Sequence, residues 1–348
     1  MTGLATADGA PLPSDGGAPG VGAAPWEQYR RELTAYCYRM LGSSADAEDA
    51  VQDTMVRAWK GYDRFEGRSA LRSWLYRIAT NVCLTMLDSR KRRARPMDMG
   101  PVGSAHGELT PPLPETTWIE PVPDERVMPT AGDPADVAVS RESVRLAFVA
   151  ALQHLPPRQR VVLILREVLQ WRASEVAELL DTSVASVNSA LQRARATLSD
   201  NDLDESPGSV EEMDEAHTEL LARYSDAFQR YDMTALVALL HEDVVMSMPP
   251  YPLWLRGTDE FIAWMTGTGA ECEGSRLVPV AANGQPGFAQ YRRRPDGSGY
   301  FGWALQVLEI TGGRITGLNS FLDVQTLFPM WGLVTELDEQ GRPVTATA

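Results

Sequence analysis

The 348-residue sequence predicts a multidomain chain in which two all-α domains are followed by an α+β domain. Apolar residues recur at helical spacing in residues 26–95 and 133–198. Residues 96–132 lie between them, hold eight prolines and show no periodicity, which is typical of a linker. After residue 216, helical patterns give way to alternating segments joined by short turns, which indicates helices packed on an antiparallel sheet.

Charge is distributed unevenly along the chain. The net charge of −15 argues against a nucleic-acid partner for the chain as a whole. However, residues 26–95 hold 14 basic against 9 acidic residues, and residues 141–198 hold 8 against 5. Residues 96–140 hold 1 against 8. The two basic segments are therefore the ones to examine for contact with nucleic acid.

The composition excludes several classes of protein. The longest aliphatic run, Val161 to Leu165, is far shorter than the about 18 residues of a membrane span. Residues 1–25 carry no Lys or Arg and no apolar stretch, so we expect no secretory signal. Cys37, Cys83 and Cys272 are too few and too scattered for a disulfide framework or a zinc site. We expect a cytoplasmic protein with no membrane contact, no metal and no cofactor.

Three helices are predicted in the first domain. The first runs over residues 26–41 and ends at Gly42, and Ser43 is a plausible N-cap of the second. The second helix is expected to reach Trp59 and to direct that side chain inward. The third is expected to run over residues 71–93 and to end in a basic tail.

The linker and the second domain follow. Residues 96–132 are acidic and are expected to be extended, with Trp118 and Ile119 as an apolar island that docks elsewhere; the C-terminal domain is the candidate docking site. A helix is predicted over 133–154. Residues 174–198 read as a helix-turn-helix with its turn at 181–183; an ordinary helical hairpin is the alternative. The outer face of its second helix carries side chains suited to a major groove: Ser186, Asn188, Ser189, Gln192, Arg193 and Arg195.

Two further surfaces are candidates for binding. Asp46, Asp49, Gln52 and Asp53 share one helix face, which suits a basic partner helix but also an ordinary solvated face. In the third helix, Arg72, Arg77 and Asn81 interleave with Trp74 and Tyr76. Cations beside aromatic rings suit single-stranded DNA, whereas the alternative makes Trp74 a core residue.

Together these segments resemble the bacterial extracytoplasmic-function (ECF) sigma factors. The resemblance rests on "DAEDAVQDTMVRAW", "FEGRSALRSWLYRIATNVCLTMLDSRKRR" and "LPPRQRVVLILREVLQWRASEVAELLDTSVASVNSALQRARATL". The first two are similar to sigma domain 2 and the third to sigma domain 4. The turn glycine of the family is replaced by Asp181, which tolerates a left-handed turn. "ASVNSAL" also departs from the frequent "GTVRSRL", so the −35 preference does not carry over.

The resemblance implies a role for each surface. The partners would be the β′ and β subunits of the RNA polymerase core and promoter DNA, both as duplex and as the melted −10 strand. The residues implied to bind core polymerase are Asp46, Asp49, Ala50, Val51, Gln52 and Asp53. Those implied to contact −10 DNA are Phe65, Arg68, Ser69, Arg72, Trp74, Arg77, Asn81, Arg90, Lys91, Arg92 and Arg93. Residues 173–192 would read the −35 element, and the free protein would be a monomer.

The C-terminal segment resembles a SnoaL-like domain, through "WIEPVPD", "MPPYPLW" and "ANGQP". That resemblance implies an NTF2-like α+β cone. Helices are predicted over 220–231 and 236–240, and strands over 244–248, 277–281, 287–291, 300–310 and 315–321. The residues proposed to line a pocket for a small ligand are Met246, Met248, Trp254, Trp264, Tyr291, Trp303, Gln306, Phe321 and Asp323. The alternative is that the large side chains are ordinary core residues. We expect no catalytic residues. The one candidate pair is Asp323 as a base and Tyr291 as an oxyanion donor.

These readings combine into one predicted organisation. Its boundaries are 1–25 for a disordered tail, 26–95 for sigma domain 2, 96–132 for the linker, 133–198 for sigma domain 4, 199–216 for a second linker, 217–335 for the SnoaL-like domain and 336–348 for a tail. The predicted function is a sigma factor that binds core polymerase, recognises −10 and −35 elements and melts the −10 region, and whose SnoaL-like domain regulates this activity. The alternatives are a stand-alone helix-turn-helix regulator and a SnoaL-like enzyme with DNA-binding appendages.

Overall fold

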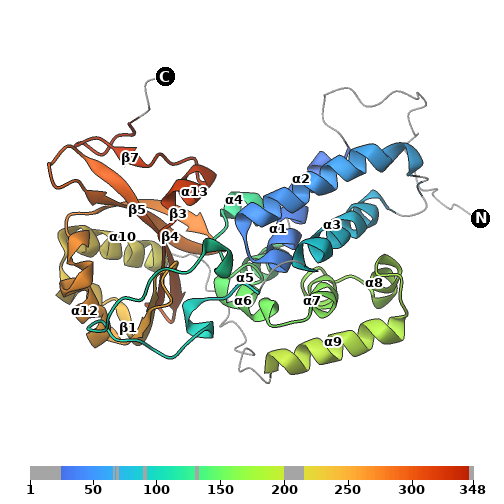
Figure 1. Ribbon diagram of the computed structural model, residues 1–348, viewed down its shortest axis with the longest axis horizontal. Coiled ribbons are helices and arrows are strands. Elements are labelled where there is room, and N and C mark those ends of the chain that lie inside the picture. Colours follow the sequence, from blue (N-terminus) through green and yellow to red (C-terminus); the bar gives the residue numbers. More distant parts are fainter. Residues whose placement is uncertain are drawn as a thin grey trace, which may run out of the picture.

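The computed structural model describes residues 25–65, 67, 70–88, 92–129, 133–199 and 215–344. A helical half and a sheet half lie side by side (Figure 1). The predictions for residues 1–24, for 200–214 of the second linker and for 345–348 concern residues outside this description. Within the described part, no helix is both long enough and apolar enough to cross a membrane.

Three helices form the first unit of the helical half: α1 (Arg30–Leu41), α2 (Ser44–Gly61) and α3 (Leu71–Asp88), with short turns η1 (Glu27–Tyr29) and η2 (Tyr62–Arg64). Gly42 ends α1 with a φ of 71°, which costs a glycine nothing. Ser43 caps α2 because its hydroxyl accepts a hydrogen bond from Asp46 N (3.1 Å). The described part of α3 ends at Asp88, and residues 92 and 93 are not helical, so the helix is shorter than predicted.

The second unit contains the remaining helices of this half: α5 (Pro134–Glu142), α6 (Leu146–Gln153), α7 (Pro157–Leu163), a π-helical turn η5 (Ile164–Val168), α8 (Ala173–Leu179) and α9 (Val184–Ser199). The single helix predicted over 133–154 is therefore two helices. The break contains buried Ser143, whose hydroxyl and carbonyl accept hydrogen bonds from the Arg39 guanidinium of α1. Burial lowers the pKa of Arg39 to about 10, so the group stays charged near neutral pH. In a continuous helix the Ser143 carbonyl would accept a hydrogen bond within the helix, so it would not be available to Arg39.

The described part of the linker, residues 96–129, is not free and extended. It contains η3 (Pro96–Asp98), η4 (Glu115–Thr117) and α4 (Asp124–Val127). Part of the segment follows the sheet half, where Gly103 N donates to Trp254 O and Leu113 N to Pro250 O (both 2.9 Å). The apolar side chains of residues 118–127 are buried, and their burial offsets the repulsion among the acidic residues that the sequence suggests.

The sheet half begins with α10 (Glu215–Arg230) and α11 (Met233–Val237) and adds α12 (Thr258–Thr266), η6 (Thr268–Cys272) and α13 (Val324–Met330). Its strands are β1 (Leu240–Ser247), β2 (Trp254–Arg256), β3 (Arg276–Ala282), β4 (Gln285–Arg293), β5 (Tyr300–Thr311), β6 (Arg314–Phe321) and β7 (Glu336–Leu337). Their order is β2-β1-β6-β5-β4-β3, with β7 beside β5; only β1 and β6 are parallel. The helix predicted over 236–240 ends earlier, because Leu240 starts β1. The strand β7 lies in the predicted tail.

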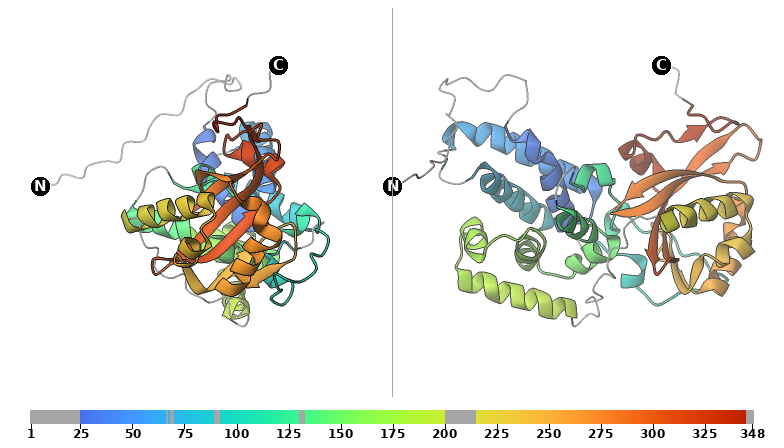
Figure 2. Two further views of the ribbon diagram at one scale, coloured as in Figure 1. Left: turned by 90° about the vertical axis from the view of Figure 1, so that its left-hand side faces the viewer. Right: turned by 180° about the vertical axis from the view of Figure 1, so that it is seen from behind.

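The sheet is buried on both faces, which decides how the halves fit together. Phe288, Leu308 and Leu318 pack with α10, α11 and α12 in one hydrophobic core. Leu305 and Val307 of β5 point to the other face of the sheet from Leu308. They belong to the hydrophobic core that includes α1–α3, α6–α9 and α13. Figure 2 shows the helical half next to the sheet half. The two halves are therefore joined by a shared apolar core.

Candidate polymerase and promoter surfaces

The surface of α2 differs from the predicted acidic stripe. Asp49, Gln52 and Asp53 reach the surface, whereas Ala50 and Val51 are fully buried. The same helix face continues through Val56 and Trp59, which are 43% and 57% exposed. The inward orientation predicted for Trp59 is therefore wrong. Large exposed apolar side chains beside carboxylates are typical of protein–protein interfaces, because burying the apolar area against a partner removes it from water.

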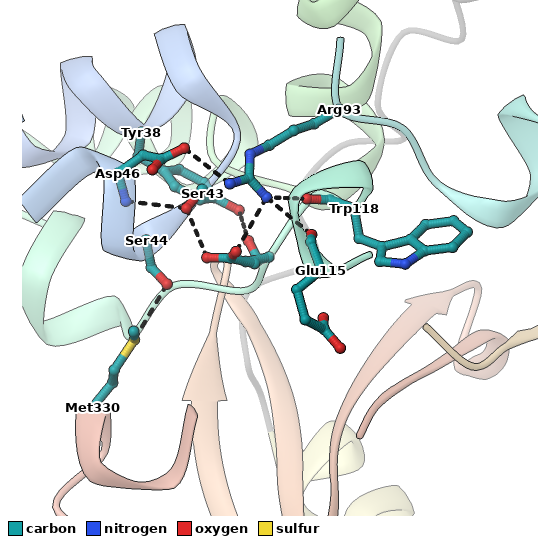
Figure 3. Close-up of polar contacts among 9 residues, drawn as sticks. Tyr38, Ser43, Ser44, Asp46, Arg93, Glu115, Trp118 and Met330 are labelled. Atoms are coloured by element: carbon teal, nitrogen blue, oxygen red, sulfur yellow. Dashed lines mark hydrogen bonds and ion pairs between the residues drawn. The ribbon is translucent and has the colours of Figure 1, made fainter. Parts of the chain in front are cut away.

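Asp46, predicted on that surface, is instead buried in an ion-pair network (Figure 3). The guanidinium of Arg93 contacts the Asp46 carboxylate (2.9 Å) and the Glu120 carboxylate (3.1 Å). It also donates to the Trp118 carbonyl (2.6 Å), and Ser43 Oγ donates to Glu120 (2.7 Å). Arg93 is 7% exposed, so this arrangement does not offer it to DNA as predicted.

The linker residues Trp118 and Ile119 are buried where the parts of the chain meet. Trp118 is 1% exposed, and its indole points away from Arg93 (Figure 3). Both residues line the same small cavity as Phe321 and Leu327 of the sheet half. Ile119 N also donates to Ala94 O (3.1 Å), which fixes the linker beside the segment that follows α3.

The candidate −10 surface lies on α3 and the loop before it. Phe65 packs on Trp74, with ring centroids 4.9 Å apart. Tyr76 is fully buried, so it is not part of an exposed aromatic surface. Asn81 is exposed, and Arg92 contacts His154 Nδ1 (2.9 Å). Burial and the Arg92 charge lower the pKa of His154. Arg68, Ser69, Arg90 and Lys91 lie outside the described residues.

Two of the candidate −10 residues contact the helix-turn-helix unit. The Arg72 guanidinium lies over Tyr76 (5.3 Å) and over Trp171 (5.6 Å), which precedes α8. Arg77 Nη2 donates to Glu178 O of α8 (2.9 Å). Figure 1 shows α3 between α2 and the pair α7–α8. Side chains that suit single-stranded DNA are thus used to hold the two helical units together.

The recognition helix is free of such contacts. Helices α8 and α9 enclose a turn in which Asp181 has a φ of 49°, the left-handed conformation expected from its sequence position. All six residues predicted to face DNA are exposed. Arg195 pairs with Glu167 (2.7 Å), and Ser183 caps α9 through Ser186 N (3.1 Å). The side chains at positions 188, 189, 192 and 193 have no hydrogen-bond partner within the described part of the chain.

Asn283 connects the sheet half to three segments of the helical half. It occupies the β3–β4 turn with a φ of 58° and is fully buried. Its Nδ2 donates to Tyr38 Oη (2.6 Å) and to Val144 O (2.7 Å), and its Oδ1 accepts from Val122 N (3.0 Å). Burial raises the pKa of Tyr38, so its hydroxyl stays protonated and donates to Glu120 O (2.8 Å). The sequence marks Asn283-Gly284 only as a turn.

Of the nine residues predicted to line a pocket, Phe321 and Asp323 line the small cavity beside Trp118. Tyr224 Oη donates to Gln306, Gln306 to Gln290, and Gln290 to Ser275, which closes a buried chain of hydrogen bonds across the sheet. Met246, Trp264, Tyr291 and Phe321 are buried core residues. Trp254 bonds Gly100 O, and the Trp303 ring lies against the Arg292 guanidinium. Met248 is partly buried beside the core on α10–α12.

The conceivable catalytic pair has other roles in this structure. Asp323 accepts a hydrogen bond from Thr326 N (3.4 Å) and caps α13. Tyr291 Oη donates to Val334 O (2.7 Å). A cavity of about 670 Å³ does exist, but it lies between α10, the β3–β4 hairpin and the helical half, and none of the nine predicted residues lines it.

Comparison with known proteins identifies the parts of the chain. Residues 26–93 match Sigma-70 region 2, residues 145–198 match Sigma-70 region 4, and residues 221–318 match the SnoaL-like domain. The ECF RNA polymerase sigma factor SigG of Mycobacterium tuberculosis is 47% identical over 322 residues, covering 89% of this chain and 83% of that protein. SigJ of the same organism is 28% identical over 249 residues, covering 70% and 71%. The crystal structure of SigJ has the same fold, with a TM-score of 0.56 at 23% identity over 92% of this chain and 99% of that one.

The chain therefore belongs to the ECF family of RNA polymerase sigma factors and carries a C-terminal SnoaL-like domain. The predicted fold class is confirmed: helical sigma units precede an α+β domain. Family membership selects a transcription initiation factor over a stand-alone regulator, because the chain carries both sigma regions.

Proposed function

We propose that the exposed face of α2 binds the polymerase core. This face comprises Asp49, Gln52, Asp53, Val56 and Trp59. The observation that carries the proposal is the exposure of Trp59. A large apolar side chain on a monomer surface contributes binding free energy when a partner covers it and excludes water. The carboxylates beside it favour a basic partner surface, which agrees with the implied contact to the β′ subunit.

For promoter DNA, we propose that the exposed face of α9 reads the −35 element and that α3 with its preceding loop engages the melted −10 strand. Asn188, Gln192 and Arg193 have the donors and acceptors that base edges and phosphates need. The Phe65–Trp74 pair supplies a stacking surface for unpaired bases. In this proposal residues 26–95, 133–198 and 217–335 act as three functional domains of a cytoplasmic factor.

The SnoaL-like domain is proposed to restrain the two sigma units rather than to catalyse a reaction. Arg72 and Arg77 are engaged by the helix-turn-helix unit, and Arg93 is engaged by the linker. The linker is in turn held by Asn283 of the SnoaL-like domain. DNA engagement would require these contacts to open, so the compact arrangement favours an inactive state. The buried hydrogen-bond chain through Gln306 supports a structural rather than a catalytic interior.

The experiment is run-off transcription with purified core polymerase, combined with a direct measurement of core binding. Trp59→Ala is expected to weaken core binding at least tenfold and to reduce transcripts accordingly. Val139→Ala, which truncates an exposed apolar side chain on α5 outside the proposed face, is the control and is expected to bind normally. Equal core binding by wild type and the Trp59 variant would refute the proposed polymerase surface.

A further inference from the structure

A pocket lies where the helical half meets the sheet half, and both halves build it. Its volume of about 670 Å³ falls within the roughly 300–1,000 Å³ of small-molecule sites. The sheet half contributes residues 279–281 and 284–288 of the β3–β4 hairpin and one face of α10. The helical half contributes Asp124 of α4 and Arg141 of α5. Neither half forms the site by itself.

Most of the lining is apolar. Leu221 and Ala222 of α10 line the pocket together with Pro279, Val280 and Phe288 of the hairpin. Two polar residues of the α10 face already have partners, because Asp226 pairs with Arg230 (2.5 Å) and Ser225 accepts from Gln229. This part of the pocket therefore suits the hydrocarbon body of a ligand, which gains free energy by leaving water.

The polar end of the pocket holds one acceptor and one donor. The Asp124 carboxylate accepts a single hydrogen bond, from Gly284 N (2.7 Å), and has no ion-pair partner within the described part of the chain. The Arg141 guanidinium forms neither a hydrogen bond nor an ion pair with any described residue. The two groups are close enough for the Arg141 charge to lower the pKa of Asp124, but burial has the larger effect and raises that pKa to about 6.

We propose that this pocket binds a small amphiphile whose apolar body lies against α10 and the β3–β4 hairpin and whose uncharged head group both donates and accepts hydrogen bonds. A primary amide is the simplest such head group. Its N–H would donate to Asp124, and its carbonyl would accept from Arg141. A carboxylate head is repelled by Asp124, and an ammonium head is repelled by Arg141. A molecule that spans both halves also stabilises the compact arrangement, a consequence that rests on the proposed restraining role of the SnoaL-like domain.

The test compares three probes with one tail: octanamide, octanoate and octylamine. Titration calorimetry with the full-length protein at pH 7.5 is expected to give saturable binding, with octanamide at least tenfold tighter than the other two. Asp124→Asn removes the carboxylate charge but keeps the shape, so octanoate is expected to gain relative to octanamide. No saturable binding of any probe, or equal affinities for all three, would overturn the proposal.

Substitutions on α10 test the location. Ala222→Phe fills the pocket from an exposed position and is expected to abolish octanamide binding. Ala216→Phe makes the same change at an exposed position of α10 that does not line the pocket, and it is expected to bind normally. Equal loss in both variants would refute the assigned site.

The regulatory consequence has a separate readout. Octanamide is expected to lower run-off transcription by the wild type and to leave the Ala222 variant unaffected. If octanamide binds without changing transcription, the proposed binding site is supported, but its proposed effect on the compact arrangement is refuted. The proposed restraining role of the SnoaL-like domain is tested separately: it is refuted if Asn283→Gly leaves run-off transcription unchanged.

Discussion

The junction at Asn283 offers the sharpest test of how the SnoaL-like domain is joined to the sigma units. Asn283→Gly keeps the positive φ that the turn requires but removes the three side-chain hydrogen bonds. In the compact state, Tyr38 Oη loses one partner, and Val122 N and Val144 O lose theirs. In an open state, water satisfies these groups. The variant therefore acts on the equilibrium between the two arrangements and leaves the separate cores intact.

The magnitude follows from Val122 N and Val144 O, which are left without partners, and from Tyr38 Oη, which keeps only its bond to the Glu120 carbonyl. Each buried polar group that loses its hydrogen bond costs about 1–3 kcal/mol, and such costs do not add fully when the groups share one site. We expect the compact arrangement to lose about 3–4 kcal/mol, which is a shift of roughly 10²–10³-fold toward the open arrangement.

Two solution measurements check this expectation. Hydrogen–deuterium exchange is expected to speed up over residues 119–124 and 281–285, and small-angle scattering is expected to show a larger radius of gyration. Run-off transcription is expected to rise. Asp296→Gly is the control, because Asp296 lies in the exposed β4–β5 turn and its side chain accepts hydrogen bonds from Ser298 of the same turn. Unchanged exchange and unchanged dimensions in the Asn283 variant would refute the reasoning.

Three other predictions concern single side chains. Arg93→Ala removes the buried cation that contacts both the Asp46 and the Glu120 carboxylate, so chemical denaturation is expected to show a loss of about 3–5 kcal/mol; a loss below about 1 kcal/mol would contradict the network. Arg193→Ala is expected to leave thermal stability unchanged but to weaken binding to a −35 duplex by about 1–3 kcal/mol in holoenzyme, with unchanged affinity as the opposing result. For Asp124, the folded state binds the proton more tightly than the unfolded state, because burial raises its pKa to about 6. Stability is therefore expected to fall as the pH rises from about 4 to about 6, and Asp124→Asn is expected to remove this dependence and to gain up to about 2–3 kcal/mol at pH 7.5; parallel pH profiles would disprove it.

Local patterns predicted the elements well where the physical cause is local. Gly42 ends α1 and Ser43 caps α2 because the conformational freedom of glycine and the reach of a serine hydroxyl act within one helix turn. Asp181 occupies the left-handed position in the helix-turn-helix for the same kind of reason. The exposed residues of α9 follow from helical periodicity alone, since the apolar stripe of that helix fixes which side faces outward.

The errors concern residues whose surroundings come from distant segments. Periodicity cannot tell that Trp59 is exposed while Tyr76 is buried, because both are large aromatic residues on amphipathic helices. Likewise, a cluster of basic residues after a helix predicts a DNA contact, whereas Arg93 is drawn inward by carboxylates 47 and 27 residues away in the sequence.

By itself, the sequence determined the three-part organisation, the ECF family resemblance and the orientation of the recognition helix, because these depend on spacing and on short-range interactions. Only the tertiary structure decided that the second face of the sheet packs on the sigma units, that linker residues 118–127 bury their apolar side chains, and that the pocket lies between the halves. Such features arise when surfaces formed independently meet and exclude water. The residues that contact one another there, such as Asn283 and Tyr38, are far apart in the chain and leave no shared pattern in it.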